Sequence, residues 1–332
     1  MHEQTALNSD NYYGQDLLNK LWLCDLAHES IVFAHGLDLD AFLQAQLTND
    51  VHLLTEVQSQ LQGYCTPKGR LLCIFRIARW QDGILMLLPR ELEDSIIKRL
   101  RLYVLRADVR LTPMSEQLST FGIVGRDPES ELLSQVYGPL PTPPHGCKRA
   151  GERLLLAIDA PVPRYQVVGP TDVLEDDRRR LSQAYAPQSP QLWSWLDILA
   201  GLPHIRTDTQ ELFVPQMANL DILGGVNFKK GCYPGQEIVA RMRYLGKIKQ
   251  RMIRVHVESG EPPLPGEKIY APDRGEQSAG TIVNSAPNPD GGYEALAVVQ
   301  RSSIAHGDLR LRSLAGQQLT IRNLPYSIDI DE

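Results

Sequence analysis

The sequence has few cysteines and no long hydrophobic run. Its five cysteines are scattered over 332 residues without a CxxC pair, which argues against a disulfide framework and against a zinc site. The densest apolar stretches, residues 71–77 and 83–88, have the length of a strand, whereas a membrane-spanning helix needs roughly 18 or more apolar residues. We therefore expect no membrane span.

Most short catalytic motifs are also missing. The chain has no GxGxxG, GxxxxGK[ST], GxSxG or HExxH pattern, which excludes the common dinucleotide-binding, P-loop, serine-hydrolase and zinc-protease classes on motif grounds. Residues 1–18 carry no basic segment followed by an apolar one, as a secretory signal would. We therefore expect the protein to stay in the cytoplasm.

Length and hydrophobic period predict several α+β domains. The chain has 332 residues and a mass of 37.2 kDa, which exceeds the size at which a single core stops growing, so two or three domains are expected. Apolar positions in 38–47 and 92–103 follow helical spacing. Residues 57–64 and 70–79 have the character of two strands, and the turn sequence TPKG at 66–69 predicts that they form a hairpin.

The C-terminal part has a different pattern. Ile253, Val255 and Val257 alternate with polar residues, as in a strand with one buried face. Further strand-like runs follow near 267–271, 280–285, 294–300 and 318–323, separated by Gly, Pro, Asn and Asp. Five short strands with such turns predict a small antiparallel barrel. The predicted divisions of the chain are 1–110 and 111–189, both α+β, then 190–250, and the barrel at 251–332.

Positive charge is concentrated in one segment. The net charge is −6, but residues 229–254 hold eight basic residues against the single acid Glu237, so this segment carries +7 and the rest of the chain −13. A focused basic segment in an acidic protein points to an anionic ligand or to nucleic acid. The alternative is an ordinary solvated basic face.

The densest group of polar, glycine and cysteine residues is NFKKGCYPGQE at 227–237. Pro234, followed by a glutamine, a glutamate and an apolar run, predicts that a helix begins here. Cys232 would then lie just ahead of a helix N-terminus and beside two lysines, which are conditions that favour a reactive thiolate. The alternative is that Cys232 is a small buried hydrophobe and that the glycines only shape the turn.

The octapeptide KGCYPGQE at 230–237 resembles the K-G-C-[FY]-x-G-Q-E signature of the YgfZ-type folate-binding proteins, which are relatives of the glycine-cleavage T-protein, an aminomethyltransferase. Other blocks match this family in the same order along nearly the full chain. They are QLTNDV at 46–51, KGR at 68–70, AGLP at 200–203, PQMANL at 215–220 and LPYS at 324–327.

The resemblance implies a three-domain ring that binds tetrahydrofolate at its centre and ends in a β-barrel. Residues 1–110, completed by 190–250, would form the folate-binding domain. The implied role is to maintain iron–sulfur enzymes and the tRNA modification that depends on them, notably methylthiolation, and an effect on replication initiation is also attributed to the family. Iron–sulfur tRNA-modifying enzymes are then the expected partners.

The same resemblance suggests which residues act. Cys232 would be the reactive or sulfur-handling residue, while Trp193 falls on a tryptophan position that family members use for folate. For Trp193 the alternative is ordinary core packing, because Trp195 and Leu199 share its helix. The expected folate-binding residues are Trp193, Lys230, Gly231, Tyr233, Gly235, Gln236, Glu237 and Arg241.

Three positions depart from the family pattern. Glu29 stands where relatives carry a second tryptophan on the ligand side, and Leu199 replaces the glutamate that usually precedes Ala-Gly. The T-protein has a catalytic aspartate after the hairpin glycine, but this chain has LLCI at 71–74. A general base for aminomethyl transfer is therefore missing there.

Two other functions stay open at this point. One is a folate-dependent one-carbon transferase or demethylase built on the same scaffold. The other is a direct tRNA-binding module whose footprint is the basic segment, in which case affinity would fall steeply with salt. The charge of −13 outside that segment argues against binding a long polyanion.

Overall fold

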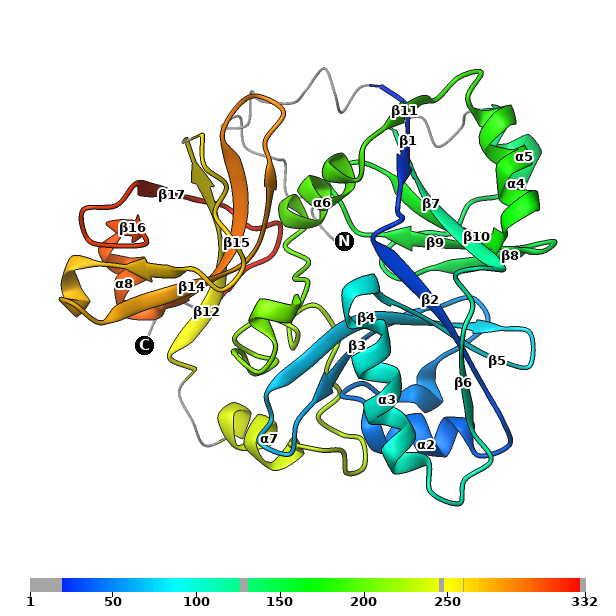
Figure 1. Cartoon of the computed structure of the whole chain (residues 1–332), viewed down its shortest axis with the longest axis horizontal. Coiled ribbons are helices and arrows are strands. Elements are labelled where there is room, and N and C mark those ends of the chain that lie inside the picture. Colours follow the sequence, from blue (N-terminus) through cyan, green and yellow to red (C-terminus); the bar gives the residue numbers. More distant parts are fainter. Residues whose placement is uncertain (1–19, 126–130, 245–247, 259, 329–332) are drawn as a thin grey trace, which may run out of the picture.

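The computed structural model describes residues 20–125, 131–244, 248–258 and 260–328. Residues 1–18, in which no secretory signal is expected, and Lys247 of the basic segment lie outside these ranges. In the described part, three groups of strands are arranged around the middle of the molecule (Figure 1). No helix among the described residues is long and apolar enough to cross a membrane.

The first unit is a five-stranded antiparallel sheet with two helices. Its strand order is β3-β4-β5-β2-β6, and the β3–β4 pair is the predicted hairpin. Apolar positions at helical spacing, such as Leu39 and Leu43 on α2, and Ile96 and Leu100 on α3, join the core of this sheet. The elements are β2 (Glu29–His35), α2 (Leu39–Gln46), β3 (Gln60–Cys65), β4 (Leu71–Trp80), β5 (Gly83–Pro89), α3 (Glu93–Val104) and β6 (Arg110–Pro113).

The second unit is a six-stranded sheet of order β11-β1-β7-β10-β9-β8. Residues on one face of β9, Leu154 and Leu156, belong to the large shared core, whereas Leu155 and Ala157 on the other face pack with α4 and α5. The elements are β1 (Trp22–Asp25), β7 (Leu118–Val124), α4 (Glu131–Tyr137), β8 (Cys147–Ala150), β9 (Arg153–Ile158), β10 (Arg164–Pro170), α5 (Thr171–Leu181) and β11 (Ala186–Gln188).

The third unit is a closed barrel, as predicted. Ile253, Val255 and Val257 point into its core, but the barrel has six strands instead of five. The additional strand, β16, has only three residues, which is too short for a visible alternation. The elements are β12 (Gln250–Val257), β13 (Lys268–Tyr270), β14 (Ser278–Pro287), β15 (Tyr293–Gln300), α8 (Arg301–His306), β16 (Leu309–Leu311) and β17 (Gln318–Arg322).

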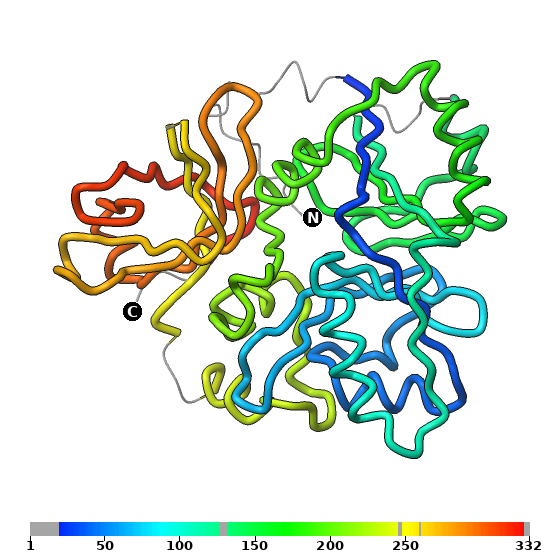
Figure 2. The backbone as a smooth tube through the Cα atoms, in the orientation of Figure 1, coloured from blue at the N-terminus to red at the C-terminus, as the bar shows by residue number. Residues whose placement is uncertain are grey.

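Helix α6 (Pro190–Leu199) connects the units. It packs against β1 of the second sheet and against β14 and β15 of the barrel. The backbone trace in Figure 2 shows the blue N-terminal strands crossing from the second sheet into the first, so both sheets share one stretch of chain. A continuous hydrophobic cluster includes residues from all three units. The predicted α+β architecture with a C-terminal antiparallel barrel is thus confirmed.

Candidate functional site

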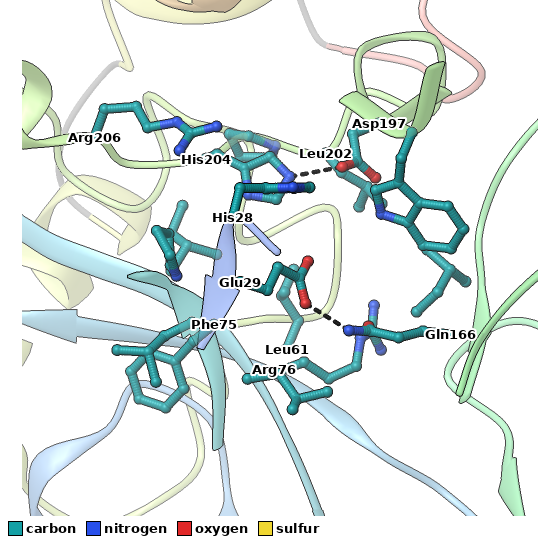
Figure 3. A pocket seen from close by; sticks show the side chains of 17 residues that line it. His28, Glu29, Leu61, Phe75, Arg76, Gln166, Asp197, Leu202, His204 and Arg206 are labelled. Carbon is teal, nitrogen blue, oxygen red and sulfur yellow. Dashed lines mark hydrogen bonds and ion pairs between the residues drawn. The ribbon is translucent and has the colours of Figure 1, made fainter. Parts of the chain in front are cut away.

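A pocket, called here the central pocket, lies where the two sheets meet α6 and the loop that follows it (Figure 3). Strands β2, β3, β4, β5, β9 and β10 contribute side chains to it, so it forms only when segments far apart in the sequence come together. Its polar lining is His28, Glu29, Arg76, Gln166, Asp197, His204 and Arg206, and its apolar walls include Phe75, Trp193 and Leu202.

Asp197 is the centre of an ion-pair network at the pocket wall. Its residue is 3 % exposed, one carboxylate oxygen lies 2.6 Å from a guanidinium nitrogen of Arg164, and the other lies 2.9 Å from Nε2 of His204. Burial opposes ionisation of Asp197, but Arg164 and His204 outweigh it and lower its pKa to about 2. The wall therefore carries a carboxylate that is ionised at neutral pH and already compensated.

Glu29, the first residue of β2, places a second carboxylate in the pocket. Gln166 Nε2 donates a hydrogen bond of 2.5 Å to Glu29 Oε2 and one of 3.2 Å to the hydroxyl of Thr120. Figure 3 shows the Glu29 carboxylate between the Gln166 amide and the imidazoles of His28 and His204. Burial raises the pKa of Glu29, and neighbouring His204 partly offsets that rise.

Arg76 and His28 face the same space. Arg76 on β4 is 7 % exposed, donates to the Ser59 hydroxyl at 3.1 Å and lies 2.9 Å from Nδ1 of His145. His28 has a buried Nδ1 that finds no hydrogen-bond partner among the described residues. Burial lowers the pKa of His28 to about 4, so this imidazole is neutral at pH 7.

Trp193 is the predicted ligand residue that lines the central pocket. Its residue is only 2 % exposed, and the guanidinium carbon of Arg164 lies 4.6 Å from the centre of its ring. A Cβ added to Gly122 would come within 2.4 Å of the indole, so the ring rests directly on strand β7. Trp193 therefore packs as a core residue and also contributes to the pocket wall.

The signature residues 230–237 lie elsewhere, between the end of α2 and the β3–β4 turn. The Lys230 ammonium group donates to the backbone carbonyls of Gln44, Leu47 and Asn49 at 2.6, 2.5 and 3.0 Å. A cation in this position satisfies carbonyls at the C-terminal end of a helix and interacts favourably with its dipole. Burial lowers the pKa of Lys230 to about 8.

The two glycines of the signature have different surroundings. Gly235 has φ +86°, and a Cβ there would lie 2.5 Å from the Cα and N atoms of Gly69 in the hairpin turn. The signature loop and the hairpin turn thus touch backbone to backbone. Around Gly231, by contrast, a Cβ would meet nothing within 4 Å.

Helix α7 (Gln236–Tyr244) begins where the proline and acidic residue predicted, beside the tip of the β3–β4 hairpin (Figure 1). Cys232 is exposed, so the alternative of a buried small hydrophobe is wrong; the other four cysteines are buried free thiols. Glu237 and Arg241 are also exposed, Tyr233 is buried, and Gln236 donates to the Lys230 carbonyl at 3.2 Å.

The structure therefore separates the predicted residues into two places. Trp193 lines the central pocket, whereas Cys232 and the seven predicted folate-binding residues within 230–241 do not line it; their contact with folate stays a prediction. Sequence reasoning missed the polar lining, apart from marking Glu29 as a departure. The sequence did offer one indication of this site, because Arg76 stands inside the apolar run of β4. A charged side chain is rarely buried in a protein unless it has a partner.

The basic segment is also divided by the fold. Arg251 pairs with Asp221 at 2.9 Å and Arg254 with Glu294 at 3.6 Å, and all four side chains are at most 8 % exposed. Together with Lys230, three of the eight cations are therefore used inside the protein. Within the described ranges, no three His, Cys, Asp or Glu side chains are grouped closely enough to hold a metal ion.

Comparisons with known proteins place the chain among relatives of nearly equal length. No protein-family model matches it. It is 31 % identical to the tRNA-modifying protein YgfZ of Serratia proteamaculans over 93 % of both chains, and 32 % identical to that of Edwardsiella ictaluri over 90 % of both. The YgfZ of Yersinia enterocolitica is 28 % identical over 98 % of this chain and 99 % of its own.

A solved structure matches the fold. The glycine cleavage system aminomethyltransferase T from Bartonella henselae superposes with a TM-score of 0.72 at 14 % identity, covering 92 % of this chain and 86 % of that one. The predicted T-protein-like arrangement is therefore confirmed as a fold.

Proposed function

Because this chain belongs to the YgfZ family of tRNA-modifying proteins, we propose that it supports tRNA modification and that it binds a tetrahydrofolate-type ligand in the central pocket. More specifically, the protein would act in the cytoplasm as an accessory factor that maintains iron–sulfur enzymes, above all those that methylthiolate tRNA. An effect on replication initiation would follow from that role.

The observation that carries the folate proposal is the mixed lining of the central pocket. A pterin is a flat ring system with hydrogen-bond donors and acceptors along one edge, so it needs apolar walls and a few fixed polar groups. Phe75 and Leu202 supply apolar wall, while Glu29 and Arg76 supply an acceptor and a donor. The Nδ1 of His28, which has no hydrogen-bond partner in the described part of the chain, is one more polar atom that a ligand would satisfy. The side chains that line the central pocket are therefore suited to bind a pterin.

Exposed Cys232 supports the proposed link to sulfur chemistry. Its thiol is accessible beside the N-terminal end of α7, whereas the other four cysteines are buried. Direct tRNA binding through the basic segment has less support, because three of the eight cations are bound within the protein. A continuous basic stripe would be needed for such a footprint.

The folate part is tested by titrating intrinsic tryptophan fluorescence with tetrahydrofolate. We expect saturable quenching in the wild type and a weaker response in Trp193→Ala, because this side chain forms part of the wall. A variant on the opposite side of the second sheet, Tyr165→Phe, serves as the control. A wild type that gives no signal at millimolar ligand would contradict the folate proposal.

The tRNA part is tested by complementation of a strain that lacks its own YgfZ. We expect the wild-type chain to restore methylthiolated tRNA nucleosides, measured by mass spectrometry, and Cys232→Ala to fail although it folds normally. Full restoration by Cys232→Ala would remove the cysteine from the proposal. No restoration by the wild type would contradict the tRNA role itself.

A further inference from the structure

Two opposite charges face the central pocket without pairing with each other. Glu29 begins β2 and Arg76 lies on β4, with only β5 between these strands in the sheet. In the part of the chain that the structure describes, neither side chain has an oppositely charged partner within 4.0 Å. A charge inside a protein is costly unless it is paired or hydrogen-bonded, so both groups call for an explanation.

Each group is anchored from one side only. The Gln166 amide, itself bonded to Thr120, holds Oε2 of Glu29. One guanidinium nitrogen of Arg76 is held by Ser59 and His145. For Oε1 of Glu29 and the second terminal nitrogen of Arg76, no hydrogen bond to a described residue is present. Both side chains are therefore fixed in place while part of their bonding capacity is left for a ligand.

An acceptor and a donor of this kind are the groups that one edge of a pterin requires. The pyrimidine part of a pterin presents a carbonyl acceptor, a ring N–H donor and an exocyclic amino donor side by side. A carboxylate accepts two adjacent N–H groups as it does from arginine, and a guanidinium donates to a carbonyl. The neighbouring carboxylate, Asp197, is already occupied by Arg164 and His204. Glu29 is thus the carboxylate with an oxygen available.

We propose that Glu29 and Arg76 recognise the 2-amino-4-oxo edge of the pterin, with Glu29 accepting from the ring N–H and the 2-amino group and Arg76 donating to the 4-oxo group. This inference rests on the proposed function, because it specifies which part of a folate the pocket selects. Burial raises the pKa of Glu29 in the free protein, and two N–H donors from the ligand would favour the ionised form.

The test measures binding by calorimetry with 5-formyltetrahydrofolate, and with pterin and lumazine as fragments. Lumazine has a 2-oxo group where pterin has the 2-amino group, so it offers Glu29 an acceptor instead of a donor. We expect the wild type to bind pterin at least tenfold more tightly than lumazine. Glu29→Gln should weaken binding of 5-formyltetrahydrofolate at least tenfold and abolish the preference for pterin.

One control variant and the comparison of ligands separate the possible failures. Glu152→Gln, on the exposed β8–β9 turn, should bind like the wild type. If the wild type binds 5-formyltetrahydrofolate but Glu29→Gln binds it equally well, or lumazine binds as tightly as pterin, the assignment of Glu29 is overturned while folate binding stands. If the wild type binds none of the three, the proposed function fails and this inference fails with it. Should Glu29→Gln not fold, the wild-type comparison of pterin with lumazine still decides.

Discussion

At the scale of single residues, Lys230 of the signature has a structural role that the motif does not reveal. The Lys230 ammonium group satisfies three backbone carbonyls near the end of α2, and one of them belongs to Leu47, which is fully buried. A sequence motif identifies such a lysine as important but cannot distinguish a ligand contact from a helix-end contact, because the acceptors lie about 180 residues away in the chain.

We predict that Lys230→Met lowers the free energy of unfolding by about 3 kcal/mol, since unsatisfied buried acceptors cost about 1–3 kcal/mol each and partial relaxation recovers some of the loss. Urea unfolding followed by circular dichroism measures this change. Cys232→Ala, two residues away and exposed, is the matched control and should stay within about 0.5 kcal/mol of the wild type. Equal stability of both variants would contradict the helix-end role.

His145 makes stability depend on pH. Burial and the adjacent Arg76 lower the pKa of His145 from 6.5 to about 4, so the unfolded chain takes up a proton at this residue before the folded protein does. The contribution to stability is therefore complete above pH 6.5 and is lost as the pH falls from 6.5 toward 4. His28, with its pKa lowered to about 4, acts in the same direction.

We predict that His145→Asn makes the decline of the urea midpoint between pH 6.5 and 4 shallower. Asparagine tolerates the positive φ of 62° at this position, keeps an acceptor near Arg76 and does not titrate. The decline should not vanish, because His28 remains. An unchanged slope would show that His145 is as easily protonated in the folded protein as in the unfolded chain.

At the scale of elements, the contact between the signature loop and the β3–β4 hairpin depends on one glycine. Gly235→Ala would place a methyl group 2.5 Å from the Gly69 backbone, at a φ of +86°. We predict a loss of more than about 2 kcal/mol in unfolding free energy. Gly231→Ala, in open space in the same loop, should change stability by less than about 0.5 kcal/mol. Equal losses in the two variants would contradict this contact.

Elements with a clear period could be predicted from the sequence. The helix at α2, the hairpin of β3 and β4, the start of α7 and the alternation in β12 all follow local patterns. The short strand β16 could not be predicted, because three residues show no period. The pairing of β1 with β7 was also out of reach, since their register joins Leu23 to Ile123 across the whole first unit.

At the scale of the whole molecule, the sequence blocks that match the family lie far apart in the chain but form contacts between the units. The Tyr326 hydroxyl of LPYS donates to the Gly201 carbonyl of AGLP at 2.8 Å, and the Asn219 amide of PQMANL donates to the Met252 carbonyl of the first barrel strand at 2.8 Å. These blocks carry the family resemblance. Their structural role is to hold the barrel against α6 and the first unit.

The central pocket exists only at this scale, which is why the sequence did not predict its polar lining. Glu29, Arg76, Gln166 and Asp197 come from four different elements of two sheets and a helix. No local pattern joins them, and only the family resemblance suggested that a ligand lies near Trp193. The chemistry of the pocket becomes visible when these four side chains are seen together.

A crystal structure of the protein with 5-formyltetrahydrofolate tests most directly whether a folate binds in the central pocket. We predict that the pterin lies in the central pocket, beside Glu29 and Arg76 and against the wall that includes Trp193. The same structure decides whether residues 230–241 touch any part of the folate. A ligand bound only at those residues, or a pocket without ligand at a concentration that saturates binding in solution, would contradict folate binding in the central pocket.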